Sequence, residues 1–176
     1  GMAMDAGNVA QFHVVVRGQC WLNIADDQRR LSSGDIVVLP LGDAHALSDD
    51  PASDRVPGLH VLEAIHQDRP LFQDGAAGVT LLCGHFEFDR ALNHPLIREL
   101  PRLIHVKGMD RRQPGWLELI APMLVGETGS GQPGADTIVE RLAEVLLIQV
   151  LRLHLLEERQ TRGFLAAIAD RRISGA

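Results

Sequence analysis

The chain has 176 residues, of which 45% are hydrophobic and 23% charged, a composition that is ordinary for a folded globular protein and excludes extended disorder. Its 17 basic and 23 acidic residues give a net charge of −6 and are interspersed along the sequence, so a basic nucleic-acid-binding surface is not indicated. The two cysteines are too few for a disulfide framework, and no apolar run is long enough to span a membrane. These features predict a protein of the reducing cytoplasm.

The first half of the chain is predicted to be β-structure. Short runs of β-branched and other apolar residues alternate with turn residues, at the spacing that is typical of sandwiches and barrels. Turns are predicted at Arg17-Gly18, at Asp26-Asp27 and at Ser33-Gly34, and a polar loop is predicted over 49–58. The predicted strands are 11–17, 19–24, 35–39, 45–48, 59–65 and 79–88.

The second half has mainly helical spacing. A short helical turn is predicted within 93–101, and a strand follows at 103–106. The segment 116–127 has helical periodicity, and Pro122 within it either kinks the helix or lies near its start. A flexible connection, GETGSGQPGAD, precedes the next helix.

The segment 137–158 gives the strongest helical pattern in the chain. Thr137 and Glu140 have the spacing of a capping box, and Asp136 is a second candidate for the N-cap. The apolar residues cover most of the helix circumference, so this helix must be covered on a second side. The covering element is either the chain's own helices, predicted at 116–127 and 163–170, or the same helix of a second subunit.

A short motif indicates the fold more specifically. The pattern Gly34-x5-Pro40-x-Gly42-x2-His45 resembles the second conserved motif of the cupin superfamily, with Asp49 at the position where cupins often have Asn. In physical terms, a turn at Gly34 leads into a buried strand, Pro40 and Gly42 reverse the chain, and His45 points inward on the next strand. The resemblance implies a jelly-roll-like cupin β-barrel followed by a C-terminal helical region, a mainly β fold with added α-structure.

Almost the whole chain from Phe12 resembles the cupin-type effector domain of AraC-type transcriptional regulators. The stretches that carry this likeness include FHVVVRGQCWLNI, LLCGHFEFD and RLAEVLLIQVLRLHL followed by GFLAAIADRRISGA. The resemblance implies a barrel over 2–90 and a helical region over 91–176. It also implies a small-molecule effector, a homodimer formed through the 137–158 helix, and contact with DNA only through a C-terminal domain that is not in this chain.

The metal site of enzymatic cupins is not intact in this sequence. The family resemblance places the glutamate ligand of the first motif at Gln11, and its histidine pair near residues 4–7, which read MDAG. Another set of ligands remains: His13, His45, Cys83 and His85 offer the nitrogen and thiolate ligands that a divalent transition metal such as zinc prefers. The alternative is that His13 is a core histidine hydrogen-bonded to the backbone or to Gln11, and that Cys83 is a small buried apolar side chain.

We therefore expect a ligand-sensing and dimerisation domain of an AraC-type regulator, without catalytic activity. The residues expected to line its effector pocket are Gln11, His13, Trp21, His45 and His85. A small metal-dependent cupin enzyme of the dioxygenase or isomerase class is the alternative, and a standalone cupin binding module is another.

Overall fold

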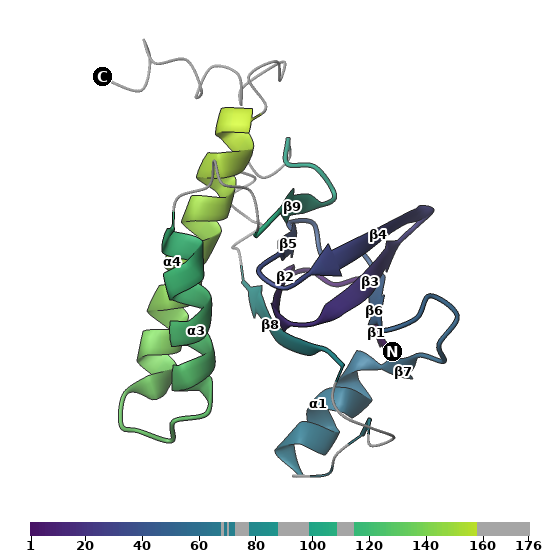
Figure 1. Ribbon diagram of the computed structural model, residues 1–176, viewed down its shortest axis with the longest axis horizontal. Coiled ribbons are helices and arrows are strands. Elements are labelled where there is room, and N and C mark those ends of the chain that lie inside the picture. The colour runs from purple at the N-terminus through teal and green to yellow at the C-terminus, as the bar shows by residue number, and fades with distance from the viewer. Residues whose placement is uncertain (68, 70, 73–77, 88–98, 109–114, 158–176) are drawn as a thin grey trace.

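The computed structural model describes residues 1–67, 69, 71–72, 78–87, 99–108 and 115–157, and its strands form two sheets (Figure 1). We call them sheet A and sheet B, and the space between them the interior. Sheet A contains, in spatial order, β4 (Asp27–Ser32), β3 (Gln19–Ile24), β6 (His45–Ser48), β1 (Met2–Met4) and β7 (Val56–Pro57). Sheet B contains β8 (Thr80–Phe86), β2 (Ala10–Arg17), β5 (Ile36–Leu39) and β9 (Ile104–Val106).

The fold is a β-rich, cupin-like arrangement with helices, but the two sheets do not form a closed barrel. Within the described ranges, each strand pairs only inside its own sheet. The predicted strands that correspond to β2, β3, β5, β6, β8 and β9 are confirmed to within a few residues at their ends. Strands β1, β4 and β7 were not predicted, because β1 and β7 are very short and β4, DQRRLS, is a polar edge strand.

Two glycines of the cupin motif lie where the chain passes from one sheet to the other. Gly34, between β4 and β5, has φ +89°, and Gly42, between β5 and β6, has φ +69°. A Cβ atom at Gly42 would also overlap the carbonyl oxygens of Gly7 and Val9. Only glycine adopts this backbone conformation without strain, so these residues explain why the chain turns so abruptly before His45.

Two apolar layers stabilise the fold. The interior cluster lies between the sheets and consists of Val15, Cys20, Leu22, Leu31, Val37 and Leu47. The outer cluster lies between sheet B and the helices α3 (Trp116–Thr128) and α4 (Ala135–Glu157), and includes Phe12, Val14, Ile36, Val38, Leu124, Leu146 and Val150. Alternate residues of β2 and β5 therefore face the interior and the helices, as strand geometry requires.

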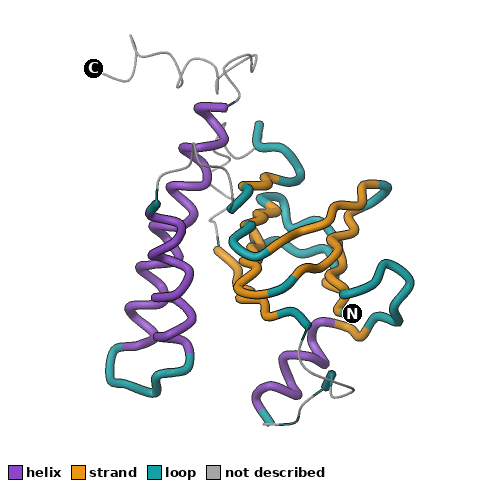
Figure 2. The backbone as a smooth tube through the Cα atoms, viewed as in Figure 1, coloured by secondary structure: helices purple, strands orange, loops and turns teal. Residues whose placement is uncertain are grey.

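Helices α3 and α4 pack side by side and cover the outer face of sheet B (Figure 2). Pro122 lies inside α3, so the alternative that it lies near the start of the helix is wrong. Strand β9 belongs to the predicted helical region, yet it pairs with β5 and extends sheet B. The two predicted regions thus share one apolar cluster.

One predicted element has the wrong type. The segment 59–65 was expected to be a strand, but it forms α1 (Gly58–His66). The buried residues of this helix, Gly58, Val61 and Ala64, recur at intervals of three and pack toward β1 and β7. The run LHVLEAI is too short for its period to distinguish a helix from a strand, and packing against the sheet edge favours the helix.

Two predicted helical segments, most of 93–101 and all of 163–170, lie outside the described residues. Among the helices that the structure describes, none has both the length and the hydropathy needed to cross a bilayer.

Candidate functional site: a cavity beside a buried histidine pair

His13 and His45 meet in the interior. His13 lies on β2 of sheet B and His45 begins β6 of sheet A, and their Nε2 atoms are 2.7 Å apart. Their exposed fractions are 1% and 5%. The inward position that was expected for His45 is therefore confirmed, and the pair joins the two sheets.

The neighbouring hydrogen bond assigns the protons of this pair. Nδ1 of His45 lies 2.9 Å from the carbonyl oxygen of Asp43. A carbonyl oxygen only accepts hydrogen bonds, so Nδ1 carries the proton of His45 and Nε2 is left as an acceptor. Nε2–H of His13 then donates to His45, and Nδ1 of His13 is an acceptor that has no partner among the described residues.

Both imidazoles are neutral at physiological pH. Burial, together with the charge that His45 would carry, lowers the pKa of His13 from 6.5 to about 3. Burial also lowers the pKa of His45, although the carbonyl and carboxylate of Asp43 oppose the shift. A proton added to the pair would lie in an apolar interior without a carboxylate in contact, so the pair resists protonation.

The geometry of the pair does not fit a zinc ion. Two nitrogen ligands at the usual Zn–N distance of about 2.1 Å lie about 3.4 Å apart in a tetrahedral site, whereas these two nitrogens are 2.7 Å apart. At this separation they hydrogen-bond to each other. Nor do the residues that the structure describes include any group of three or more His, Cys, Asp or Glu side chains arranged to hold a metal ion.

The structure places the other predicted metal ligands on the same interior face. Cys83 lies opposite His13 in the pairing of β8 with β2, and His85 lies opposite Gln11. Directly opposed residues of antiparallel strands share a face, so all of these side chains belong to the interior side of sheet B. Gln11 is 6% exposed, and within the described part of the chain its Oε1 atom has no hydrogen-bond partner.

Trp21 is not part of this site. Its neighbours on β3, Cys20 and Leu22, are in the interior cluster, so strand alternation places Trp21 on the outer face of sheet A. The guanidinium of Arg30 lies over the indole ring, with its Cζ atom 6.0 Å from the ring centroid. This placement corrects the expectation that Trp21 lines an effector pocket.

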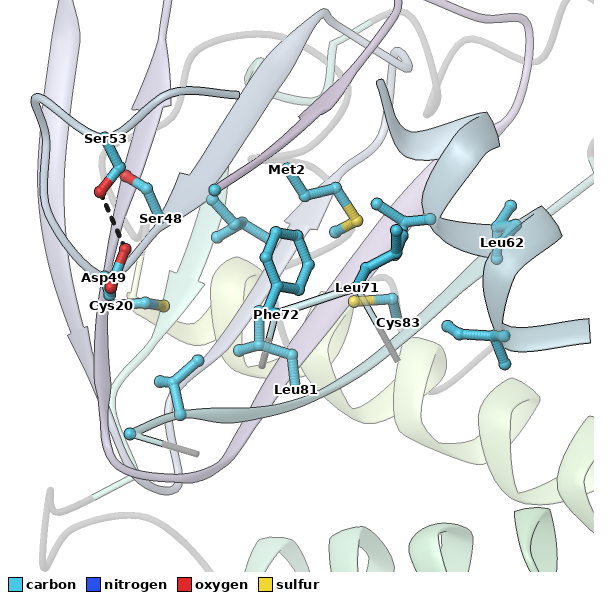
Figure 3. Close-up of a pocket in the computed structure, with 16 residues that line it drawn as sticks. Met2, Cys20, Ser48, Asp49, Ser53, Leu62, Leu71, Phe72, Leu81 and Cys83 are labelled. Carbon is cyan, nitrogen blue, oxygen red and sulfur yellow. Dashed lines mark hydrogen bonds between the residues drawn. The ribbon is translucent and has the colours of Figure 1, made fainter. Parts of the chain in front are cut away.

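A cavity of about 590 Å³ opens between the sheets and α1, with Cys83 in its wall (Figure 3). Its walls come from both sheets, from α1 and from the segment that follows α1. The residues that line it are Gly1, Met2, Cys20, Leu47, Ser48, Asp49, Ser53, Val61, Leu62, Ile65, Leu71, Phe72, Gly78, Val79, Leu81 and Cys83. Among the predicted site residues, only Cys83 contributes to this wall.

The sequence did not predict most of the residues that line this cavity. Strand 59–65 was expected where α1 supplies Val61, Leu62 and Ile65 to the wall. The available signal was the excess of large apolar residues in this short segment, because Leu62 and Ile65 remain 49% and 67% exposed. Large apolar side chains that stay open to solvent around a hollow are typical of a binding site.

The cavity contains both thiols of the chain. Cys20 is buried at 1% exposure, whereas the side chain of Cys83 is exposed to the open space. Poor solvation of a thiolate between apolar walls raises the pKa of Cys20 to about 11 and that of Cys83 to about 12. Both groups are therefore neutral thiols, and neither has the lowered pKa of a catalytic nucleophile.

Comparison with known proteins identifies the family. Residues 1–156 match the cupin family. A putative AraC-like transcription regulator of Streptomyces antibioticus is 32% identical to this chain over 99% of its length, and the match covers 58% of the relative. The HTH-type transcriptional regulator AlkR of Acinetobacter baylyi is 26% identical over 93% of this chain and 56% of its own length.

An uncharacterised HTH-type transcriptional regulator of Haemophilus influenzae is 26% identical over 98% of this chain and 55% of its own length. The chain thus spans a little more than half the length of these curated relatives. It belongs to the cupin family, and its relatives include HTH-type and AraC-like transcriptional regulators.

Proposed function

We propose that this chain is the ligand-sensing and dimerisation domain of a cytoplasmic AraC-type transcriptional regulator. A small-molecule effector binds in the cavity, and DNA is contacted by a domain that is not part of this chain. The cavity volume of about 590 Å³ carries the proposal, because it lies within the range that small organic ligands occupy in proteins. The similarity to an AraC-like regulator and to HTH-type regulators supports the same function.

The position of β8 supports a route from the cavity to the helices. Leu81 and Cys83 face the cavity, while Leu82 and Phe86 pack against the outer cluster with α3 and α4. A ligand that fills the cavity thus contacts one face of a strand whose other face supports the helical layer. If the ligand binds better to one arrangement of the helices than to another, it shifts the population toward that arrangement.

The histidine pair adjoins this cavity, because Cys83 both lines the wall and lies opposite His13. We place Gln11, His13, His45 and His85 as the polar layer beside the effector, with the two imidazoles serving to hold β2 against β6. An enzymatic function has less support, because the imidazoles hydrogen-bond to each other instead of presenting two open ligand positions.

Helix α4 supports dimerisation with a second copy of the chain. Its buried residues Ala143, Leu146 and Val150 face sheet B and α3. At about 100° per residue, Ile148 and Val145 lie on the side of the helix away from these residues, and they are 49% and 43% exposed. Ile138, 42% exposed, lies between the two sides. A helix with apolar side chains on two opposite sides requires cover on both, which a second subunit would provide.

The experiment that tests effector binding uses a neutral fluorescent probe, N-phenyl-1-naphthylamine, whose emission rises in an apolar site. We expect saturable binding to the protein and at least a tenfold loss of affinity in Leu62→Trp and in Cys83→Phe, which fill the cavity. The matched control is Leu59→Trp, because Leu59 is on the same helix and 66% exposed but does not line the cavity. Circular dichroism establishes that each variant is folded.

Two results would overturn the proposed site. One is a probe that binds with equal affinity to the parent and to both cavity-filling variants, which would place the apolar site elsewhere. The other is the absence of saturable binding by any small apolar molecule to the folded parent protein.

A further inference from the structure

The polarity of the cavity is uneven. Ser48, Asp49 and Ser53 gather at one end, and the labelled side chains at the other end, among them Leu62, Leu71 and Phe72, are apolar (Figure 3). A ligand that fills this space meets polar groups with only one of its ends. This arrangement matches an elongated amphipathic molecule, with a head at the serine and aspartate end and a tail toward α1.

The charged side chain at the polar end of the cavity is negative. Asp49 is the only charged side chain in the described lining, which contains no Lys, Arg or His. Oδ1 of Asp49 accepts hydrogen bonds from the Ser53 hydroxyl at 2.9 Å and from the backbone N–H of Asp50 at 3.0 Å. These bonds lower the pKa of Asp49, so the carboxylate is ionised at neutral pH.

The amino group of Gly1 is the one positive group in the described lining, and its charge contributes to the lowered pKa of Asp49. The amino group of Gly1 donates a hydrogen bond to the carbonyl oxygen of Asp54 at 2.9 Å. A carboxylate head group entering the cavity would approach the ionised Asp49, and the described lining holds no basic side chain to compensate for its lost hydration. The Gly1 amino group already interacts with the Asp49 carboxylate. An ammonium or hydroxyl head can instead donate a hydrogen bond to Asp49.

We propose that the effector is an apolar molecule whose head group donates hydrogen bonds and carries no negative charge, and that Asp49 selects against anionic heads. This inference rests on the function proposed above and specifies the ligand of the same cavity. Selectivity arises from unfavourable contacts with the wrong ligand as much as from favourable ones with the right one.

The test compares three molecules with the same ten-carbon chain: decylamine, decanol and decanoate. Each molecule is added as a competitor to the protein with bound N-phenyl-1-naphthylamine. The titrations are made at neutral pH and below the micelle concentration of the competitor. We expect decylamine to displace the probe at a concentration at least fivefold lower than decanoate, since an exposed charge contributes about 1 kcal/mol, equivalent to about fivefold in affinity. Decanol should also displace the probe more effectively than decanoate.

Asp49→Asn is the decisive variant, and Asp54→Asn is its control. Both remove one negative charge from the same loop, but Asp54 does not line the cavity. We expect Asp49→Asn to abolish the difference between decylamine and decanoate, and Asp54→Asn to retain it.

Two outcomes would overturn the ligand class. Tighter binding of decanoate than of decylamine is one, and an equal effect of both aspartate variants is the other, because net charge alone would then explain the preference. In either outcome the parent protein still binds the probe. If the proposed function itself is wrong, the parent protein shows no saturable probe binding.

Discussion

His13 and His45, 32 residues apart in the sequence, bring their Nε2 atoms to 2.7 Å in the interior and so join sheet B to sheet A. His45, the histidine of the second cupin motif, accepts a hydrogen bond from the imidazole of His13. Its own Nδ1–H donates to the carbonyl oxygen of Asp43. The position that carries a metal ligand in enzymatic cupins therefore makes a hydrogen bond between the two sheets in this chain.

The histidine pair predicts a specific loss of stability in acid. The pKa of His13 is about 3 in the folded protein and 6.5 when unfolded, so between these values the unfolded chain binds the additional proton. Stability is therefore complete above pH 6.5 and falls as the pH is lowered, by about 2 kcal/mol at pH 5 from His13 alone. Urea unfolding at a series of pH values measures this slope.

The variant His13→Gln separates this effect from the titration of carboxylates. The Gln amide N–H can still donate to Nε2 of His45, but it does not titrate. The variant should show a flatter dependence of unfolding free energy on pH between about 6.5 and 5. Identical slopes in parent and variant would show that His13 is not the buried neutral group described here.

The same geometry predicts that the protein holds no stoichiometric zinc. The nitrogen separation of 2.7 Å suits a hydrogen bond and is too short for two ligands of one tetrahedral ion. Elemental analysis of protein purified without chelator and without a nickel column should find well under one metal per chain. Stoichiometric metal that is lost in both His13→Ala and His45→Ala would restore the metal site that the ligand types alone predicted.

Much of the sheet arrangement follows from short-range signals in the sequence. Gly34, Pro40 and Gly42 are unusual residues at the points where the backbone must reverse, so they predict the turns and the inward course of His45. Alternation along β2 and β8 likewise predicts that Gln11 shares a face with His13, and Cys83 with His85.

No short-range pattern in the sequence predicts the contact between His13 and His45. The two residues lie on strands of different sheets, and their approach depends on how the sheets stack, which no local pattern encodes. Trp21 was assigned to the wrong face because its strand alternates Cys, Trp, Leu and Asn, which does not distinguish the interior from the outer face. The wall formed by α1 was missed because a nine-residue amphipathic segment has an ambiguous period.

Asp35, a second buried polar residue, stabilises the turn of the cupin motif through its hydrogen bonds. The carboxylate of Asp35 accepts hydrogen bonds from the backbone N–H groups of Ser32 and Gly108, at 3.0 and 2.9 Å, and from Nε2 of His105 at 3.1 Å. Asp35→Asn replaces one acceptor oxygen by a donor, so it should lower the unfolding free energy by about 1–3 kcal/mol. The control Asp27→Asn, in an exposed pair with Arg29, should change it by less than about 1 kcal/mol.

The sign of the pH dependence provides a further check. Burial alone would raise the pKa of Asp35, but the hydrogen bonds from His105, Gly108 and Ser32 outweigh it and hold the pKa below 3.8. The stabilisation is therefore present above about pH 4 and is lost as the pH falls through the folded-state value. The difference between the parent and Asp35→Asn should narrow in that acidic range, and a constant difference would contradict the ionised network.

The two cysteines should differ in their reaction with iodoacetamide. Cys83 is open to the cavity and Cys20 is 1% exposed, so only Cys83 should react in the folded protein. Because the pKa of Cys83 is about 12, its alkylation should be far slower than that of a free thiol at pH 8 and should accelerate about tenfold per pH unit up to pH 10. Mass spectrometry of native and urea-unfolded samples measures both rates.

Binding of N-phenyl-1-naphthylamine should protect Cys83 from this alkylation, because the probe and the thiol occupy the same cavity. The variant Cys83→Ser should remain unlabelled until it unfolds. Equal labelling of both cysteines in the folded protein would mean that the interior cluster around Cys20 is not closed.

The proposed dimer predicts that charge on the exposed side of α4 disrupts association. Val145 and Ile148 are 43% and 49% exposed, opposite the face that contacts sheet B, so an aspartate at either position leaves the apolar clusters of the subunit in place. In the dimer each substitution would desolvate a charge at the interface, and we expect the dissociation constant to rise at least tenfold. Analytical ultracentrifugation over a concentration series measures this constant.

The matched control is Leu59→Asp on α1, which introduces the same charge at an apolar residue that is 66% exposed and lies outside α4. It should leave the dissociation constant unchanged. If all three variants weaken association equally, electrostatic repulsion between subunits explains the result and α4 has no special role. If the parent is monomeric throughout the series, the exposed side of α4 is covered by something other than a second copy of this chain.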